Sequence, residues 1–358
     1  MKVLIAAAGT GGHVFPGLSV GEALVSLGVA RDDVMFVGGS RLEAEVYPSE
    51  GFPFLQVELR GLQRSLTTKN LLIPGAVLRA RKHIEEAIED SGVEVVLGMG
   101  GYVTIPAGLA ARRTEVPFFN AEQNAHAGLA NRVSARWAVK SFSAFPDTKG
   151  LPHASWVGNP VRRPFWDFDR SILRDKGLLH YGIESEIPVM GVFGGSLGAA
   201  ALNDAVIGIA ENWTGSPLQI VHLTGPGHLG GLEHRSAAPE VNWVRIGFEV
   251  SMELFFAVSD LVLARAGGAV AELTATSTPS ILVPGRFGSS GHQEENARFL
   301  TESGAAVTVP QNDLGALRVT VEETIFDDAK LDEMRNSARA IARPEAAVTI
   351  ARELLEAA

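Results

Sequence analysis

The stretch that decides the fold is the apolar run VLIAAA (residues 3–8), followed at once by the glycine-rich turn GTGGH (residues 9–13). The run is typical of a buried parallel strand, and the glycines allow a tight turn into a helix. A helix N-terminus presents unpaired N–H groups and the positive end of its dipole, which suits an anion or a sugar nucleotide. The pattern recurs half a chain later, where VMGVF (189–193) precedes GGSLGA (194–199). Two such units predict two similar α/β domains that face a shared cleft.

Apolar strands alternate with helical stretches along all 358 residues, which predicts parallel sheets in two domains. Gly158-Asn159-Pro160 breaks both periodicities and marks the linker. The predicted domains are therefore 1–157, with the C-terminal helix 343–358 packing back on it, and 158–342. We expect the first helix at about 16–28 and a loop at 59–72. The expected strands are 3–8, 34–37, 53–58, 93–97, 117–120, 139–143 and 154–157, then 188–193, 218–223, 241–246, 260–264, 279–283 and 305–308.

Composition excludes several classes of site. The chain has no cysteine, so it has no disulfide, thiolate metal site or cysteine nucleophile. No apolar run approaches the roughly 18 residues of a membrane span. A strand beginning at residue 3 leaves no room for a signal peptide, so we expect a location in the cytoplasm.

Charge is distributed unevenly. Residues 1–160 are neutral, so the net charge of −10 lies in 161–358. The stretch 59–84 contains basic residues and no acidic one, around the apolar run 71–78. A cationic segment around an apolar stretch is typical of a site that binds an anionic membrane surface. The alternative is a buried helix with a solvated basic flank.

In the first domain, His13 stands at the mouth of a helix, as a general base or as a capping residue in a structural turn. A dinucleotide site would need an acid at the end of the second strand, but Gly38-Gly39-Ser40 stands there, so such a site is disfavoured. Gly98–Tyr102 and Glu122-Gln123-Asn124 follow strands, where α/β sheets bind ligands, and are candidates to line an acceptor pocket near His13.

In the second domain, the turn at 194–199 and the Ser196 hydroxyl are candidates to bind a diphosphate. The alternative is that the small residues of this turn only allow a helix and a strand to pack closely. A diphosphate leaving group calls for a cation, and Arg162, Arg163 and Arg265 are candidates. The Glu272 carboxylate is a candidate to accept hydrogen bonds from ribose hydroxyls. The alternative is a glutamate exposed to solvent on a helix. Asp167-Phe168-Asp169 has the shape of a metal motif, but it stands where a helix cap is expected.

Seven motifs follow one another along the chain: GTGGHVFPGLSVGEAL (9–24), GMGGYV (98–103), EQNAHAGLANR (122–132), GNPVR (158–162), GGSLGA (194–199), RAGGAVAEL (265–273) and HQEENA (292–297). In this the chain resembles the MurG family, the N-acetylglucosaminyltransferases of peptidoglycan synthesis. The resemblance implies the GT-B fold, two Rossmann-like doubly wound domains with an interdomain cleft. It also implies inverting transfer of GlcNAc from UDP-GlcNAc to the MurNAc 4-hydroxyl of lipid I, giving lipid II, without metal or cofactor. The implied partners are these two substrates and an anionic membrane surface, with no nucleic acid, at the cytoplasmic face of the membrane.

The resemblance also implies roles for particular residues. His13 and Glu122 would be catalytic, with His13 the base, and Tyr102 and His126 would lie on the acceptor side. Ser196 would hold the diphosphate, Glu272 the ribose, and the backbone near Phe248 and Glu249 the uracil. The residues implied for donor binding are Thr10, Gly11, Gly12, Asn124, Arg162, Ser196, Asn203, Phe248, Glu249, Arg265, Glu272 and Gln293. The residues implied for the membrane patch are Leu71, Leu72, Ile73, Leu78, Arg79, Arg81 and Lys82.

The sequence departs from the family at two places. Ala121 stands where members commonly have histidine, and His126 is a possible substitute. The stretch between Arg265 and Glu272 is one residue short, which shifts the helix phase by about 100°.

Three other functions remain open on sequence alone. They are a GT-B UDP-sugar transferase with another acceptor, a nicotinamide-dependent oxidoreductase and a non-catalytic sugar-nucleotide sensor.

Overall fold

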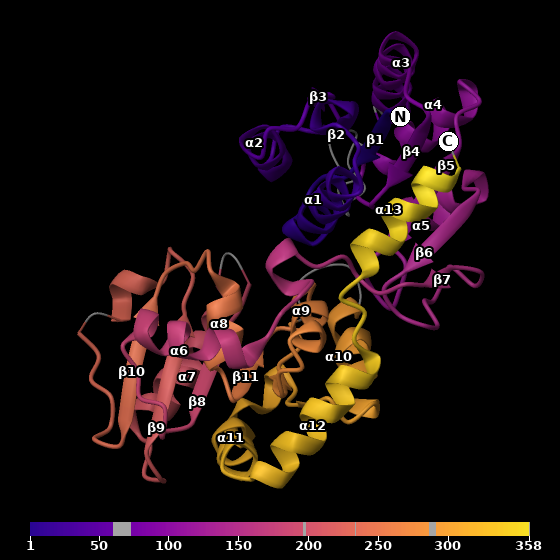
Figure 1. The fold of residues 1–358 in the computed structure, drawn as a ribbon. Helices are drawn as coiled ribbons and strands as arrows, with labels where there is room; N and C mark the ends of the chain where they lie inside the picture. The colour runs from indigo at the N-terminus through magenta and orange to yellow at the C-terminus, as the bar shows by residue number, and fades with distance from the viewer. Residues whose placement is uncertain (60–72, 196–197, 233, 286–290, 358) are drawn as a thin grey trace. The chain divides into compact units, whose positions relative to one another are not determined.

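The computed structural model describes residues 1–59, 73–195, 198–232, 234–285 and 291–357. The chain divides into two compact units (Figure 1): Met1–Arg163 with Arg343–Ala358, called unit 1, and Pro164–Ala342, called unit 2. Residues 60–72 of the loop expected at 59–72, which include Leu71 and Leu72, lie outside the described residues. The predicted diphosphate residue Ser196 also lies outside them.

Seven strands in the described part of unit 1 form a parallel sheet in the order β3-β2-β1-β4-β5-β6-β7. The strands are β1 (Val3–Ala6), β2 (Val34–Gly38), β3 (Phe54–Gln56), β4 (Val95–Gly98), β5 (Phe118–Glu122), β6 (Lys140–Ser143) and β7 (Ser155–Trp156). The helices are α1 (Gly11–Ser26), α2 (Leu42–Ser49), α3 (Ile73–Ser91), α4 (Thr104–Arg113), α5 (Leu129–Ser134) and α13 (Ala346–Glu356).

The strand order of unit 1 reverses at β1 and β4, which are neighbours in the sheet and buried along their whole length. Chain leaving the carboxyl end of β1 goes toward β2, and chain leaving β4 goes toward β5. The loops that follow β1 and β4 therefore border the position where doubly wound sheets bind ligands. These loops contain His13 and Tyr102.

The C-terminal segment belongs to unit 1, where α13 lies alongside α1 (Figure 1). Its apolar face is fully buried, with no exposed surface at Ala347, Ile350 and Leu354. Lys140 Nζ lies 2.6 Å from the Glu353 carboxylate and ties α13 to β6. The last helix thus completes the core of unit 1.

In the described part of unit 2, six strands form a parallel sheet in the order β10-β9-β8-β11-β12-β13, which reverses at β8 and β11. The strands are β8 (Val189–Phe193), β9 (Leu218–Leu223), β10 (Val241–Ile246), β11 (Leu261–Ala264), β12 (Ser280–Leu282) and β13 (Ala306–Thr308). The helices are α6 (Arg170–Tyr181), α7 (Ala200–Glu211), α8 (Met252–Val258), α9 (Ala269–Ala275), α10 (His292–Glu302), α11 (Leu317–Ile325) and α12 (Asp328–Ile341). The loops after β8 and β11 carry the second glycine turn and Arg265.

The two parallel Rossmann-like sheets confirm the predicted fold class. Two local predictions were wrong. The first helix begins at Gly11 rather than near residue 16, and Pro16 lies inside it. Proline favours the first turn of a helix and glycine is unfavourable within one, so the local pattern indicated a later start. The eight-residue helix α2 was not predicted, since it contains Pro48 and is too short for a clear helical period.

Candidate functional site

The first glycine turn places His13 in the opening turn of α1. Thr10 is extended and precedes the helix, and Gly9 has φ of +107°, in the left-handed region that favours glycine. The His13 Nδ1 atom lies 3.3 Å from the Thr10 hydroxyl. The imidazole is half-buried, while Thr10 and Gly12 are exposed. The turn therefore presents an imidazole beside the N-terminus of a helix.

The loop after β4 packs against this turn. Gly100 has φ of +92°, and a Cβ atom built there would lie 2.6 Å from Cδ2 of His13. A Cβ atom built on Gly9 would lie 3.6 Å from the Tyr102 ring. Glycine at position 100 thus allows the loops after β1 and β4 to touch, whereas the Gly9 distance corresponds to an ordinary van der Waals contact. The structure places the loop that carries Tyr102 against His13, at Gly100, as the positions of the two loops after neighbouring strands predicted.

Sequence reasoning missed Glu43, which lies in the first turn of α2 and is fully buried. Its carboxylate accepts hydrogen bonds from Tyr102 Oη at 2.7 Å, Gly39 N at 3.0 Å and Gly9 N at 3.2 Å. Burial raises the pKa of Glu43, but the hydrogen bonds to the carboxylate outweigh burial, so the pKa lies below its ordinary value. Burial and the carboxylate raise the pKa of Tyr102, which keeps its hydroxyl protonated as a donor.

Glu122, predicted to be catalytic, lies at the end of β5 and is 3% exposed. Its Oε1 accepts from the backbone N–H and the side-chain amide of Asn124, at 2.9 and 3.0 Å. Its Oε2 accepts from Gly128 N at 2.9 Å and from the Asn131 side chain at 2.8 Å. The carboxylate is thus surrounded by donors of its own loop. Asn131, quoted in a motif but given no role, shares this network.

Ala121 and His126, noted where the sequence differs from other family members, lie close to Glu122 in the chain. Ala121 is buried within β5. His126 lies on the following loop, where it forms a β-bridge with Lys149 and is half-buried. Ala121 therefore lies on the strand that leads into the loop of His126.

In unit 2, the second glycine turn closes onto the end of β9. Gly198 has φ of +78°, and a Cβ atom there would collide with the Thr224 carbonyl. Asn203, on α7, donates its Nδ2 to the same carbonyl at 2.8 Å. Its Oδ1 lies 3.1 Å from Nε2 of the buried His222. Asn203 is only 4% exposed, so its side chain helps to hold the turn in place.

The loop after β12 brings together Arg265 and Gln293. The Arg265 guanidinium donates to the Val283 carbonyl at 2.9 Å, and burial lowers its pKa. Gly285 N donates to Gln293 Oε1 at 2.7 Å, and a Cβ atom on Gly285 would lie 3.6 Å from Cζ of Arg265. Glu272 is half-buried in the first turn of α9, just after Arg265 in the chain.

The segment after β10 presents Phe248, which is 59% exposed. The neighbouring Glu249 carboxylate points to α6 instead. It accepts from Ser251 N at 2.8 Å and Tyr181 Oη at 2.9 Å, and lies 3.1 Å from His180 Nε2. Burial raises the pKa of Glu249, but these hydrogen bonds outweigh it and lower the pKa. The anchored side chain fixes the backbone on either side of it.

Arg162, a predicted donor contact, is half-buried at the end of the first segment of unit 1.

Asp169 caps α6 by accepting hydrogen bonds from the backbone N–H and the hydroxyl of Ser171, which confirms that Asp167-Phe168-Asp169 stands at a helix cap. Within the described residues, no group of three or more histidine, aspartate or glutamate side chains is arranged to hold a metal ion.

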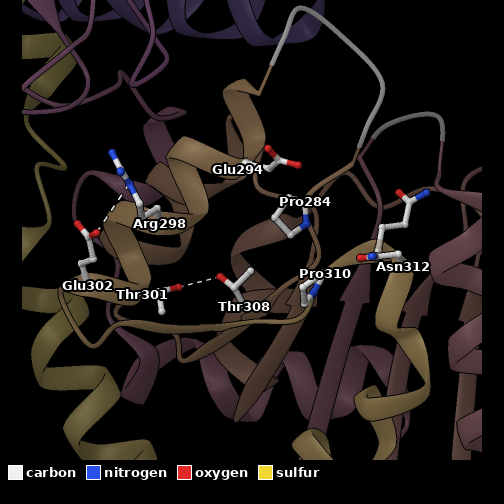
Figure 2. Close-up of a pocket in the computed structure, with 9 residues that line it drawn as sticks. Pro284, Glu294, Arg298, Thr301, Glu302, Thr308, Pro310 and Asn312 are labelled. Atoms are coloured by element: carbon white, nitrogen blue, oxygen red, sulfur yellow. Dashed lines mark hydrogen bonds and ion pairs between the residues drawn. The ribbon is translucent and has the colours of Figure 1, made fainter.

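A separate pocket of about 340 Å³ lies in unit 2 between α10 and the segments after β12 and β13 (Figure 2). Thr301 and Thr308 hydroxyls, 2.7 Å apart, and the Arg298–Glu302 ion pair border it. None of the predicted site residues lines this pocket, so it is distinct from the switch-point loops. Its lining residues are Pro284, Glu294, Arg298, Thr301, Glu302, Thr308, Pro310, Gln311 and Asn312.

Helix α3 carries the described part of the predicted membrane patch. Leu78 is 53% exposed and Arg79 is exposed beside it. Arg81 and Lys82 form ion pairs with Glu85 and Glu86, at 3.1 and 3.6 Å. No helix of the described residues combines the length and the hydropathy that crossing a bilayer requires.

Comparison with known proteins identifies the family. Residues 3–143 match the glycosyltransferase family 28 N-terminal domain, and 189–350 match its C-terminal domain. A UDP-N-acetylglucosamine–N-acetylmuramyl-(pentapeptide) pyrophosphoryl-undecaprenol N-acetylglucosamine transferase of Rhodococcus opacus is 34% identical, over 100% of this chain and 96% of its own length. The chain belongs to the MurG family. A protein of the same name from Mycobacterium sp. (strain KMS) is 36% identical over 100% of this chain and 96% of its own. The crystal structure of Acinetobacter baumannii MurG matches with a TM-score of 0.81 and 27% identity, covering 99% of this chain and 100% of that one.

Proposed function

We propose that this chain transfers GlcNAc from UDP-GlcNAc to the MurNAc 4-hydroxyl of lipid I, forming lipid II with inversion at the anomeric carbon. The full-length similarity to transferases named for this reaction carries the proposal. The glycine turns at both switch points support it, because such turns suit phosphates and sugars.

Unit 2 (Pro164–Ala342) binds the donor in this proposal. The turn 194–199, with Ser196, holds the diphosphate at the N-terminus of α7, assisted by Arg265. Glu272 accepts hydrogen bonds from the ribose, and the fixed backbone at Phe248 and Glu249 reads the uracil. Asn203 supports the turn, and Gln293 contacts the sugar. Further donor contacts come from Thr10, Gly11, Gly12, Asn124 and Arg162.

Unit 1 (Met1–Arg163 with Arg343–Ala358) binds the acceptor and supplies the base. His13 takes the proton of the 4-hydroxyl as its oxygen forms a bond to the anomeric carbon of GlcNAc. The bond from that carbon to the phosphate oxygen breaks, and UDP leaves with the electron pair. A single displacement from the opposite face inverts the anomeric carbon. The helix dipole and Arg265 stabilise the charge that develops on the leaving diphosphate.

Tyr102 and His126 lie on the acceptor side. The four donors around the Glu122 carboxylate support a role in shaping the loop 122–131, with the proton transfer assigned to His13. This loop in turn presents Asn124.

The proposed location is the cytoplasmic face of the cell membrane, reached through the first turns of α3. The basic side chains Arg79, Arg81 and Lys82 belong to the N-terminal half of this helix, whereas its C-terminal half is acidic. An anionic surface would therefore attract the N-terminal end, which also carries the exposed Leu78.

A transfer assay with UDP-GlcNAc and a lipid I analogue, with and without chelator, tests the function. We expect saturable formation of a lipid II analogue at equal rates in both conditions. Transfer only to another lipid or small alcohol would favour a different GT-B enzyme. Donor binding without turnover on any acceptor would indicate a sensor, and reduction of a substrate by NADH an oxidoreductase.

His13→Ala in the same assay tests the base. We expect kcat to fall by about 10² or more, the usual contribution of a general base, with the Kd for UDP-GlcNAc unchanged. His153→Ala, which removes an exposed imidazole of the same unit, is the control. An unchanged kcat in His13→Ala would refute the role.

A further inference from the structure

One buried carboxylate joins three loops at the switch point of unit 1. Glu43 Oε2 accepts from Gly9, after β1, while Oε1 accepts from Gly39, after β2, and from Tyr102, after β4. These are the carboxyl ends of three adjacent strands in the order β2-β1-β4. The carboxylate therefore fixes the spacing of the loops that carry His13 and Tyr102.

The glycines at the end of β2 make room for this arrangement. A Cβ atom on Gly38 would lie 2.6 Å from Cγ of Glu43, and one on Gly39 would collide with the Tyr102 hydroxyl. A dinucleotide-binding sheet places a ligand-binding acid at this position. Here the side chain of Glu43, from α2, fills this space instead. Its carboxylate accepts hydrogen bonds from groups of the protein itself.

A second residue of α2 attaches the helix to the sheet. Tyr47, on the same helix, stacks on Phe36 with ring centroids 3.9 Å apart. Its hydroxyl lies within hydrogen-bonding distance of the Ala7 and Val14 carbonyls, at 3.3 and 3.2 Å. Tyr47 thus anchors the helix, while the Glu43 carboxylate accepts hydrogen bonds from the three loops.

We propose that Glu43 is a positioning residue for the transfer reaction, which keeps the turn 9–13 and Tyr102 in register so that the His13 imidazole meets the acceptor hydroxyl. The link to His13 runs through the loop after β4, because the imidazole packs on Gly100, two residues before Tyr102. This inference rests on the proposed function, since it assigns His13 the role of base.

Glu43→Gln tests the proposal, because it keeps the shape of the side chain but removes the charge and places N–H against N–H. We expect kcat to fall at least tenfold and the KM for UDP-GlcNAc to change by a smaller factor, since most donor contacts are assigned to unit 2 and only Thr10, Gly11 and Gly12 belong to the turn 9–13. Glu45→Gln makes the same change on an exposed position of α2 and is the matched control. Equal kcat values in the two variants would overturn the proposal.

Tyr102→Phe removes one of the three donors and leaves the carboxylate in place, so it serves if Glu43→Gln unfolds. We expect kcat to fall at least threefold, again with a smaller change in donor KM. The double variant should lose less than the product of the two single losses, because both changes break the same bond. A loss equal to that product would show independent action and contradict the proposal.

Hydrogen exchange gives a readout that needs no substrate. The amides of Gly9 and Gly39 should exchange at least tenfold faster in Glu43→Gln than in Glu45→Gln, and amides of the β8 core should not change. If wild type transfers no GlcNAc, the proposed function fails while this measurement still reports on the loop contacts. Unchanged exchange at both glycines would overturn the positioning role.

Discussion

At the scale of single residues, His222 shows how burial decides a protonation state. It lies on β9 with no exposed surface, its Nε2 3.1 Å from Asn203 Oδ1. Asn203 uses its amide nitrogen on the Thr224 carbonyl, so its oxygen accepts and His222 donates from Nε2. Burial lowers the pKa of His222 from 6.5 to about 4. The neutral imidazole is thus the form that supports the second glycine turn.

This depressed pKa predicts a stability that depends on pH. Between pH 6.5 and about 4 the unfolded chain binds a proton at this position that the folded chain does not, so unfolding becomes easier as pH falls through this range. This pKa shift alone lowers the free energy of unfolding by about 2 kcal/mol when the pH falls from 7.5 to 5. Urea unfolding at both pH values measures it.

His222→Gln keeps a donor for Asn203 but does not titrate, so its pH dependence should be flatter by the same amount. His234→Gln, which removes an exposed histidine of the same unit, should keep the dependence of the wild type. If the His222→Gln and wild-type curves stay parallel from pH 7.5 to pH 5, the linkage is absent.

The sequence predicted which residues end the strands, but not which side chains they meet. His13 and Tyr102 follow neighbouring strands, so their proximity was predictable from the alternation of apolar runs and glycine turns. The role of Glu43 was not, because its partners are two backbone N–H groups and a hydroxyl from three separate loops. The enclosed position of the Glu122 carboxylate was equally invisible, since it depends on how the loop 122–131 folds back.

At the scale of elements, the expected strands agree with the structure to within a few residues, because buried parallel strands read as short apolar runs. Helix limits were less accurate, as the start of α1 at Gly11 shows. Helix α2 was missed since its anchoring depends on stacking between Tyr47 and Phe36, which a local pattern does not reveal.

Helix α3 carries a prediction at this scale. Changing Arg79, Arg81 and Lys82 to Glu should release the protein from anionic vesicles, because each cation near such a surface contributes about 1 kcal/mol. Co-sedimentation with vesicles containing an anionic lipid measures binding, with neutral vesicles for comparison. Changing the exposed Arg112, Arg113 and Arg136 to Glu alters the net charge by the same amount and is the control. Persistent binding of the α3 variant would rule out this surface.

At the scale of the whole molecule, each unit has its own sheet, its own buried core and its own reversal of strand order. Assignment of the donor to unit 2 predicts that UDP slows hydrogen exchange in β8 and β11 more than in β1 and β4. At a hundred times Kd, binding stabilises by about 2.7 kcal/mol, a roughly hundredfold change in the exchange that requires unfolding. Protection confined to β1 and β4 would contradict the assignment, and NADH in place of UDP should give none.

The return of α13 to unit 1 has a consequence for biosynthesis. Unit 2 is continuous in sequence, so all of it has been translated once residue 342 leaves the ribosome, whereas unit 1 still lacks the helix that covers α1. The apolar side of α1 therefore remains uncovered until residues 343–358 emerge. A premature stop codon that removes only this tail should leave the nascent N-terminal half prone to chaperone capture, even though every residue of the glycine turns has been made.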